Sequence, residues 1–273
     1  MLSRTQKQAV IGAVYLLMLA GISYGAYHYF KPSSSCFDNM ENGKEEGIDC
    51  GIKACGLPCP PALAELKIND EKIIQVGVDD FDFIATIYNP NQEHGASKFD
   101  YDLVAKDLEG TEMWRQSGSS FIFADQTKNL IIPRVIIDEG VAVGLVIKSA
   151  EWQKVDPNAF PNLTVRRQEF IPGSEDGAIK ASVEGLIFND TDFDFDRVDV
   201  AIMVYDQEQN LVAAAKTDIR TFISKTERHF KVFWISELPQ EINQVIIEAD
   251  TNVFDNSNFI KTHGTQERFQ KYY

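Results

Sequence analysis

The residues with the most evident chemistry are four cysteines that lie close together near the N-terminal end of the chain. Cys36, Cys50, Cys55 and Cys59 are separated by 13, 4 and 3 residues, and the 273-residue sequence has no other cysteine. An even number of clustered cysteines predicts two disulfides formed outside the reducing cytosol. The pairing stays open, because four cysteines allow three connectivities. A zinc site is the alternative, although neither close pair has the usual C-x₂-C spacing.

The segment between the first two cysteines has the length and the glycine position of a calcium loop. Asp38, Asn42, Glu46 and Asp49 stand at positions 1, 5, 9 and 12, with Gly43 at position 6. The pattern is incomplete, because position 3 has no oxygen ligand and position 12 has no glutamate. A polar turn bounded by disulfides is the alternative interpretation. We expect no resident cofactor, with calcium at these four side chains as the one candidate ligand.

Other catalytic or metal-binding patterns are missing from the sequence. Its four histidines are scattered, and no zinc-protease, hydrolase, phosphate-loop or dinucleotide motif occurs. The run 189–196 places aspartates at 190, 192, 194 and 196, so an extended segment would show them on one side. A solvated inter-strand edge and a second calcium site are both open there. We expect a protein that is not an enzyme.

Short segments rich in β-branched and aromatic residues recur from residue 66 onward, with turn residues between them. In the first hundred residues of this region we expect strands at Lys72–Val78, Phe81–Tyr88, Phe99–Lys106, Phe121–Phe123, Asn129–Ile137 and Val141–Ile147. No clean helical period appears. The pattern predicts an all-β fold of antiparallel sandwiches.

The strand pattern repeats at a nearly constant offset. The segment 83–90 aligns with 183–190 at an offset of 100, 101–107 with 200–206 at 99, and 121–122 with 222–223 at 101. This repetition predicts two homologous domains, which we place at 66–156 and 163–252, with a proline-containing joint at 156–162. On the predicted strand 200–206, Ile202 and Val204 should fill the core. The side chains of Ala201, Met203 and Tyr205 should then face the other way. The polar and aromatic tail, 253–273, shows no preference between a loose and a docked state.

An apolar run precedes the cysteines. Ala9–Phe30 has 22 residues without a formal charge apart from a possible proton on His28, enough to cross a membrane as one helix. Arg4 and Lys7 precede it, so the positive-inside rule predicts a cytoplasmic segment 1–8 and an extracytoplasmic body. The alternatives are a cleaved signal peptide and a buried core helix.

Three stretches carry resemblances. The segment 181–189, followed by Val198–Asp206 and Gln209–Val212, resembles an FxLYD-type domain, whose signature strand ends in tyrosine-aspartate. The first repeat, with Asn89-Pro90-Asn91 and the strand 99–107, is similar to late-embryogenesis-abundant domains, although it lacks the tyrosine before Asp107. Both resemblances imply immunoglobulin-like sandwiches without catalytic residues. Residues 36–59, within a Cys-rich segment that we place at 31–65, resemble a Cys-rich motif of bacterial surface proteins, with Ile52 where a second glycine is common.

The charge distribution excludes one class of partner. The formal net charge is −15, and residues 1–31 carry three bases and no acid, so the remaining chain has 23 bases against 41 acids, or −18. Such a body should repel nucleic acid. We therefore expect a single-pass, membrane-anchored surface protein that binds a protein or envelope partner. A calcium-stabilised stalk is the alternative.

Overall fold

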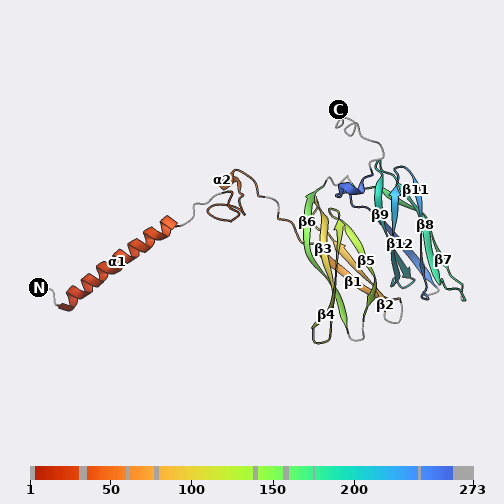
Figure 1. Ribbon diagram of the computed structural model, residues 1–273, viewed down its shortest axis with the longest axis horizontal. Coiled ribbons are helices and arrows are strands. Elements are labelled where there is room, and N and C mark those ends of the chain that lie inside the picture. The colour runs from red at the N-terminus through yellow and green to blue at the C-terminus, as the bar shows by residue number, and fades with distance from the viewer. Residues whose placement is uncertain are drawn as a thin grey trace, which may run out of the picture. The chain divides into compact units, whose positions relative to one another are not determined.

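The computed structural model describes residues 4–30, 36–59, 62–76, 80–137, 141–155, 160–174, 176–238 and 241–260. The chain divides into two compact units, Met1–Ala62 and Leu63–Tyr273 (Figure 1). The first holds a long helix and the Cys-rich segment, and the second holds the strands. The predicted joint at 156–162 lies partly outside the described residues, as does the tail beyond 260.

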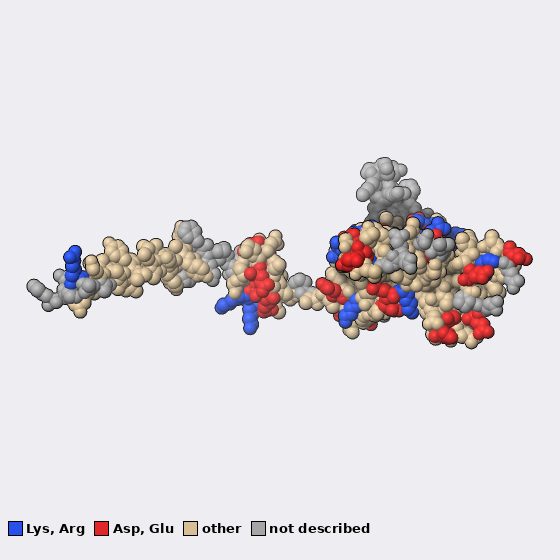
Figure 2. All heavy atoms as spheres, turned by 90° about the horizontal axis from the view of Figure 1, so that it is seen from below, with Lys and Arg blue, Asp and Glu red and all other residues tan. Residues whose placement is uncertain are grey.

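The N-terminal helix, α1 (Arg4–Phe30), has 27 residues. Its window Val10–Tyr27 is long and apolar enough to cross a membrane, and none of that window is buried within the structure. Figure 2 shows this helix as a stretch without acidic side chains, in contrast with the acidic groups spread over the rest of the chain. An exposed apolar surface of this size would be unfavourable in water, because burying it in hydrocarbon gains about 25 cal/mol per Å². The prediction of a membrane-capable helix is therefore confirmed.

Two disulfides close the Cys-rich segment, as predicted. They join Cys36 to Cys55 and Cys50 to Cys59, so that their loops overlap. A short helix, α2 (Ile52–Cys55), follows the second cysteine and includes the third, and Gly56 caps it with a left-handed φ of 68° that suits glycine. All four thiols are used, which leaves none for the alternative zinc site.

The second unit consists of two sandwiches of six antiparallel strands each. The first sandwich contains β1 (Lys67–Gln75), β2 (Asp80–Tyr88), β3 (His94–Lys106), β4 (Glu112–Ile122), β5 (Thr127–Ile136) and β6 (Ala142–Lys154). The second contains β7 (Leu163–Pro172), β8 (Ala181–Asn189), β9 (Phe195–Asp206), β10 (Leu211–Phe222), β11 (Glu227–Trp234) and β12 (Ile242–Asp250). A one-turn 3₁₀ helix, η1 (Asn256–Asn258), follows.

The two sandwiches have the same strand order. Sheet β1-β2-β5 faces β4-β3-β6 in the first, and β11-β8-β7 faces β10-β9-β12 in the second. This confirms the all-β sandwich fold. Several expected strand bounds were wrong. The first strand begins at residue 67 rather than 72, β3 at residue 94 rather than 99, and β6 continues to residue 154 rather than 147. Residues 121–122 are the end of the longer β4, and residue 123 follows it. Most of β4 was missed because polar residues such as Arg115 and Ser117 lie on its solvated face and interrupt the apolar pattern.

Each sandwich has its own core, formed by the inward side chains of both sheets. Phe83, Ile87 and Leu103 are fully buried in the first. Ile202 and Val204 are fully buried in the second, as the alternation on β9 predicts.

A buried asparagine occupies the same position in both sandwiches. Asn89 donates from Nδ2 to the carbonyls of His94 and Phe123, at 2.8 and 2.7 Å. Asn189, one hundred residues later, donates to the carbonyls of Phe193 and Phe222, at 2.9 and 3.2 Å. Each amide joins the end of one sheet to the opposite sheet. The equivalence explains why the sequence alignment places these two residues together.

We predict that Asn189→Ala destabilises the folded chain by about 2–4 kcal/mol, because it leaves two buried carbonyls without a donor. Urea unfolding followed by tryptophan fluorescence measures the change. Asn243→Ala, at an exposed position of β12, is the matched control and should change stability by less than about 0.5 kcal/mol. Equal effects of the two variants would contradict a structural role for the buried amide.

Candidate functional site

The two sandwiches share an apolar interface in addition to their separate cores. Ile74, Ile84 and Ile131 from the first sandwich pack with Met203 and Ala214 from the second. We call these five residues the interface cluster. Ala201 and Tyr205 pack against it, so the face of β9 that points away from its own core is also covered. The four sheets thus stack in the order β4-β3-β6, β1-β2-β5, β10-β9-β12 and β11-β8-β7.

A buried polar group continues the interface beside this cluster. Lys128 Nζ on β5 lies 2.8 Å from Asp250 Oδ2 on β12, and their side chains are only 11% and 15% exposed. Gln126 Nε2 donates to the same oxygen at 3.1 Å, and the Lys128 ammonium lies 3.5 Å from the centre of the Phe121 ring. Asn129 Nδ2 donates to Glu248 Oε1 at 2.8 Å. Each of these contacts joins one sandwich to the other, except the cation–π contact.

Burial shifts the pKa of the Glu248 carboxyl. Removal of water around its carboxyl raises the pKa above the ordinary 4.5, while the hydrogen bonds from Asn129 oppose the shift. The negative charge of Asp250 raises the pKa further. The interface therefore holds a carboxyl group whose ionised form is disfavoured by its surroundings.

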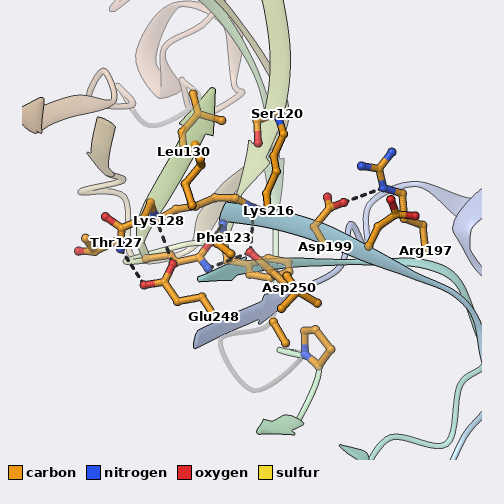
Figure 3. Close-up of a pocket in the computed structure, with 18 of the residues that line it drawn as sticks. Ser120, Phe123, Thr127, Lys128, Leu130, Arg197, Asp199, Lys216, Glu248 and Asp250 are labelled. Atoms are coloured by element: carbon orange, nitrogen blue, oxygen red, sulfur yellow. Dashed lines mark hydrogen bonds and ion pairs between the residues drawn. The ribbon is translucent and has the colours of Figure 1, made fainter. Parts of the chain in front are cut away.

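A groove of about 750 Å³ opens at this polar end of the interface. Its walls come from β3, β4 and β5 of the first sandwich, from β9, β10 and β12 of the second, and from Phe160 and Pro161 between them. Figure 3 shows Lys128, Glu248 and Asp250 together on one side and Arg197 with Asp199 on the other, with Lys216 drawn between them. Because both sandwiches line this groove and buried polar groups stand in its wall, we treat it as the candidate site.

The segment after β12 holds the two sandwiches together at one end of the groove. Asn252 Nδ2 donates to the carbonyl of Ser97, at 3.2 Å, and the ring of Phe254 lies 5.6 Å from that of Phe123. Phe259 packs on Phe195 of the second core. The start of the predicted tail is therefore docked on both sandwiches, whereas its remainder lies outside the described residues.

The side chains proposed for calcium are only partly brought together. Both carboxylate oxygens of Asp49 accept backbone N–H groups, from Asp38 at 3.0 Å and Asn39 at 2.8 Å. Asn42 Nδ2 donates to Asp38 at 3.0 Å, and Glu46 is exposed. These hydrogen bonds are the ones that a polar turn uses to order itself, as in the alternative interpretation. Calcium binding at Asp38, Asn42, Glu46 and Asp49 stays a prediction.

The acidic run 189–196 differs from the expected extended edge. Residues 191–193 form a bend between β8 and β9, and β9 begins at Phe195. Lys225 pairs with both Asp190 and Asp192, at 3.1 and 3.3 Å, and Asp194 accepts the backbone N–H of Ser224 at 2.7 Å. The bend follows from Asn189, whose buried amide holds the carbonyl of Phe193.

Other metal-binding groups are scarce among the described residues. The one trio of potential ligand atoms found there is Cys36, Glu45 and Cys55, and both of its thiols belong to a disulfide. His94 and His229 lie on different sandwiches, while the side chain of His28 and all of His263 lie outside the description.

Sequence reasoning missed the groove and the residues of its polar wall. A signal was present: 130–132 reads Leu-Ile-Ile and 201–204 reads Ala-Ile-Met-Val. Such uninterrupted apolar runs are typical of strands that are buried on both faces. They could have revealed that the two sandwiches cover each other, but not which polar side chains would meet beside them.

Comparison with known proteins adds no assignment. The chain matches no protein-family model and no curated protein. Among solved structures, a transglutaminase from red sea bream matches with 12% sequence identity and a TM-score of 0.23. The match covers 73% of this chain and 30% of that enzyme. A score this low carries no argument about fold or activity.

We predict that Glu248→Gln changes how stability depends on pH. The raised pKa means that ionised Glu248 costs stability at neutral pH and that this cost disappears as the pH falls through the raised value. Glutamine is neutral throughout. The melting temperature of the natural chain minus that of the variant should therefore increase as the pH is lowered from about 7.5 to about 4.5.

Differential scanning fluorimetry of both chains across this range measures the difference. Glu241→Gln, at an exposed glutamate, is the control and should give a nearly constant difference. A difference that stays constant for Glu248→Gln as well, or that shrinks at low pH, would contradict the burial of an unfavourable charge at the interface.

Proposed function

We propose that this chain is a membrane-anchored, extracytoplasmic binding module without enzymatic activity. The observation that carries the proposal is the succession of an exposed, membrane-capable helix and, shortly after it, a segment closed by two disulfides. Disulfides persist in oxidising compartments, so the Cys-rich segment belongs outside the cytosol. Arg4 and the N-terminus of the helix then belong inside.

The packing of the two sandwiches supports a binding role. A shared apolar cluster and several buried hydrogen bonds hold the walls of the groove in one arrangement. A preorganised site loses less entropy when it binds than a flexible one. The ionisable groups Lys128, Glu248 and Asp250 already serve the contact between the sandwiches, which supports recognition rather than acid–base chemistry. The resemblances to FxLYD-type and late-embryogenesis-abundant domains agree with a non-catalytic, immunoglobulin-like pair.

The orientation gives a sharp labelling prediction. The full chain, produced in a bacterial host, should sediment with membranes and resist alkaline extraction, and protease added to spheroplasts should remove the sandwiches. A maleimide-polyethylene glycol reagent should add no mass before reduction and four labels after it. A chain that is soluble, or that carries four free thiols in intact cells, would contradict the proposal; a soluble exported chain with intact disulfides would instead indicate a cleaved signal peptide.

Matched cysteine variants test the pairing in the same assay. Cys36→Ser should expose one thiol, that of Cys55, whereas the double variant Cys36→Ser/Cys55→Ser should expose none. If Cys36 paired with another cysteine, the double variant would expose two thiols.

A further inference from the structure

The groove between the sandwiches has the size and the mixed lining of a small-ligand site. Its volume of about 750 Å³ lies within the range of about 300–1,000 Å³ that is usual for such sites. Both sandwiches contribute to it, and the interface cluster fixes their relative position. A ligand would therefore meet a preformed cleft rather than two independent surfaces.

Three cations line the groove, and two of them are already paired. Lys128 pairs with Asp250, and Arg197 Nε donates to Asp199 Oδ1 at 2.6 Å. Lys216 on β10 forms no hydrogen bond or ion pair with any residue that the structure describes. It is therefore the cation of the described wall that is available for an incoming anion.

The surroundings of Lys216 favour such an anion. The Lys216 side chain is exposed as a whole, but partial burial by the groove walls lowers its pKa, an effect opposed by Asp199 and increased by the like charge of Arg197. An anionic group placed beside Lys216 would compensate the lost hydration. Five acidic residues also line the groove, so one negative charge on a ligand is tolerated there better than two; they are Asp125, Asp199, Asp218, Glu248 and Asp250.

Two hydroxyl groups lie in the wall opposite this cation. Tyr101 and Ser120 line the groove, and their hydroxyls have no hydrogen-bond partner among the described residues. Tyr101 can reach the groove because its ring lies over Gly118, where any Cβ atom would collide with it. Each hydroxyl can both donate and accept, which suits a ligand that also carries hydroxyls.

An aromatic side chain completes the lining. Phe160 is 41% exposed, and its ring is held edge-on against Phe123 with 5.0 Å between the ring centres. An exposed ring face with a negative quadrupole attracts C–H groups that carry partial positive charge. The groove thus combines one available cation, two hydroxyls and one aromatic surface.

We propose that this groove binds a sugar acid, a uronate residue of an acidic glycan, with its carboxylate at Lys216. The sugar hydroxyls lie against Tyr101 and Ser120, and its C–H face lies on Phe160. A uronate carries one negative charge, which the carboxylates in the walls oppose less than the nearly two charges of a phosphate. The assignment deepens the proposed function by naming a ligand for the module, and it rests on that function only in treating the chain as a binding protein.

The test is calorimetric titration of the full chain, in detergent micelles, with the methyl glycoside of galacturonic acid, a single uronate with one carboxylate. The acid should bind, while its methyl ester, which lacks the charge, should bind at least about tenfold more weakly. Lys216→Gln should lose about tenfold in affinity for the acid, and Lys216→Arg should retain most of it. Lys106→Gln, at an exposed lysine outside the groove, is the control and should bind like the natural chain.

The contrary outcomes are distinct. Equal binding of acid and ester, or an unchanged affinity for Lys216→Gln, would overturn the placement of the carboxylate. Tighter binding of inorganic phosphate than of the uronate would overturn the ligand class. Absence of binding by a chain that unfolds cooperatively would overturn the site itself. Because the titration does not depend on orientation in a membrane, a failure here leaves the labelling test of the proposed function intact.

Discussion

The structure of the sandwich unit depends on one constraint: each sandwich has a sheet that is apolar on both faces and must be covered twice. Ile84 and Ile131 face each other across β2 and β5 on the side away from their own core, and Met203 and Ala214 do the same across β9 and β10. Covering these positions is favourable only if the two sheets meet. The stack of four sheets follows, and the groove at its end follows from the stack.

Apolar contact alone does not determine how two flat surfaces align, because it has little directionality. The buried polar contacts beside the cluster supply the alignment, since a shift of one residue would leave Lys128 and Asp250 buried without partners. Removing one partner of a buried pair costs about 3–5 kcal/mol, although the pair itself adds little stability. Burial raises the pKa of Glu248. Because water is excluded there, the Glu248 carboxyl depends on the hydrogen bond that Asn129 donates, and this contact also specifies the alignment of the two sandwiches. Stability and alignment thus come from different residues of one interface.

The sequence predicted the features that depend on the local pattern of apolar and polar residues and on the internal repeat. Alternation on β9 correctly placed Ile202 and Val204 inside, and the offset of 100 residues correctly paired Asn89 with Asn189. The sequence could not predict the disulfide pairing, which depends on the path of the loop. Nor could it predict the contact of Lys128 with Asp250, which are 122 residues apart. The bend at 191–193 was missed because alternation of aspartate and phenylalanine resembles a strand when the buried amide that breaks it is not known.

The repeated fold also shows how the outer sheets of the stack differ from the inner ones. At the offset of 100, Ile84 and Ile131 correspond to Glu184 and Lys231, which face each other across β8 and β11 and pair at 2.8 Å. At the offset of 99, Ala214 corresponds to Arg115, which pairs with Asp102 on the outer face of the first sandwich. Each sandwich is therefore apolar on the sheet that meets its neighbour and charged on the opposite sheet. Covering either outer face would desolvate these ion pairs, so their charges suit sheets that face water.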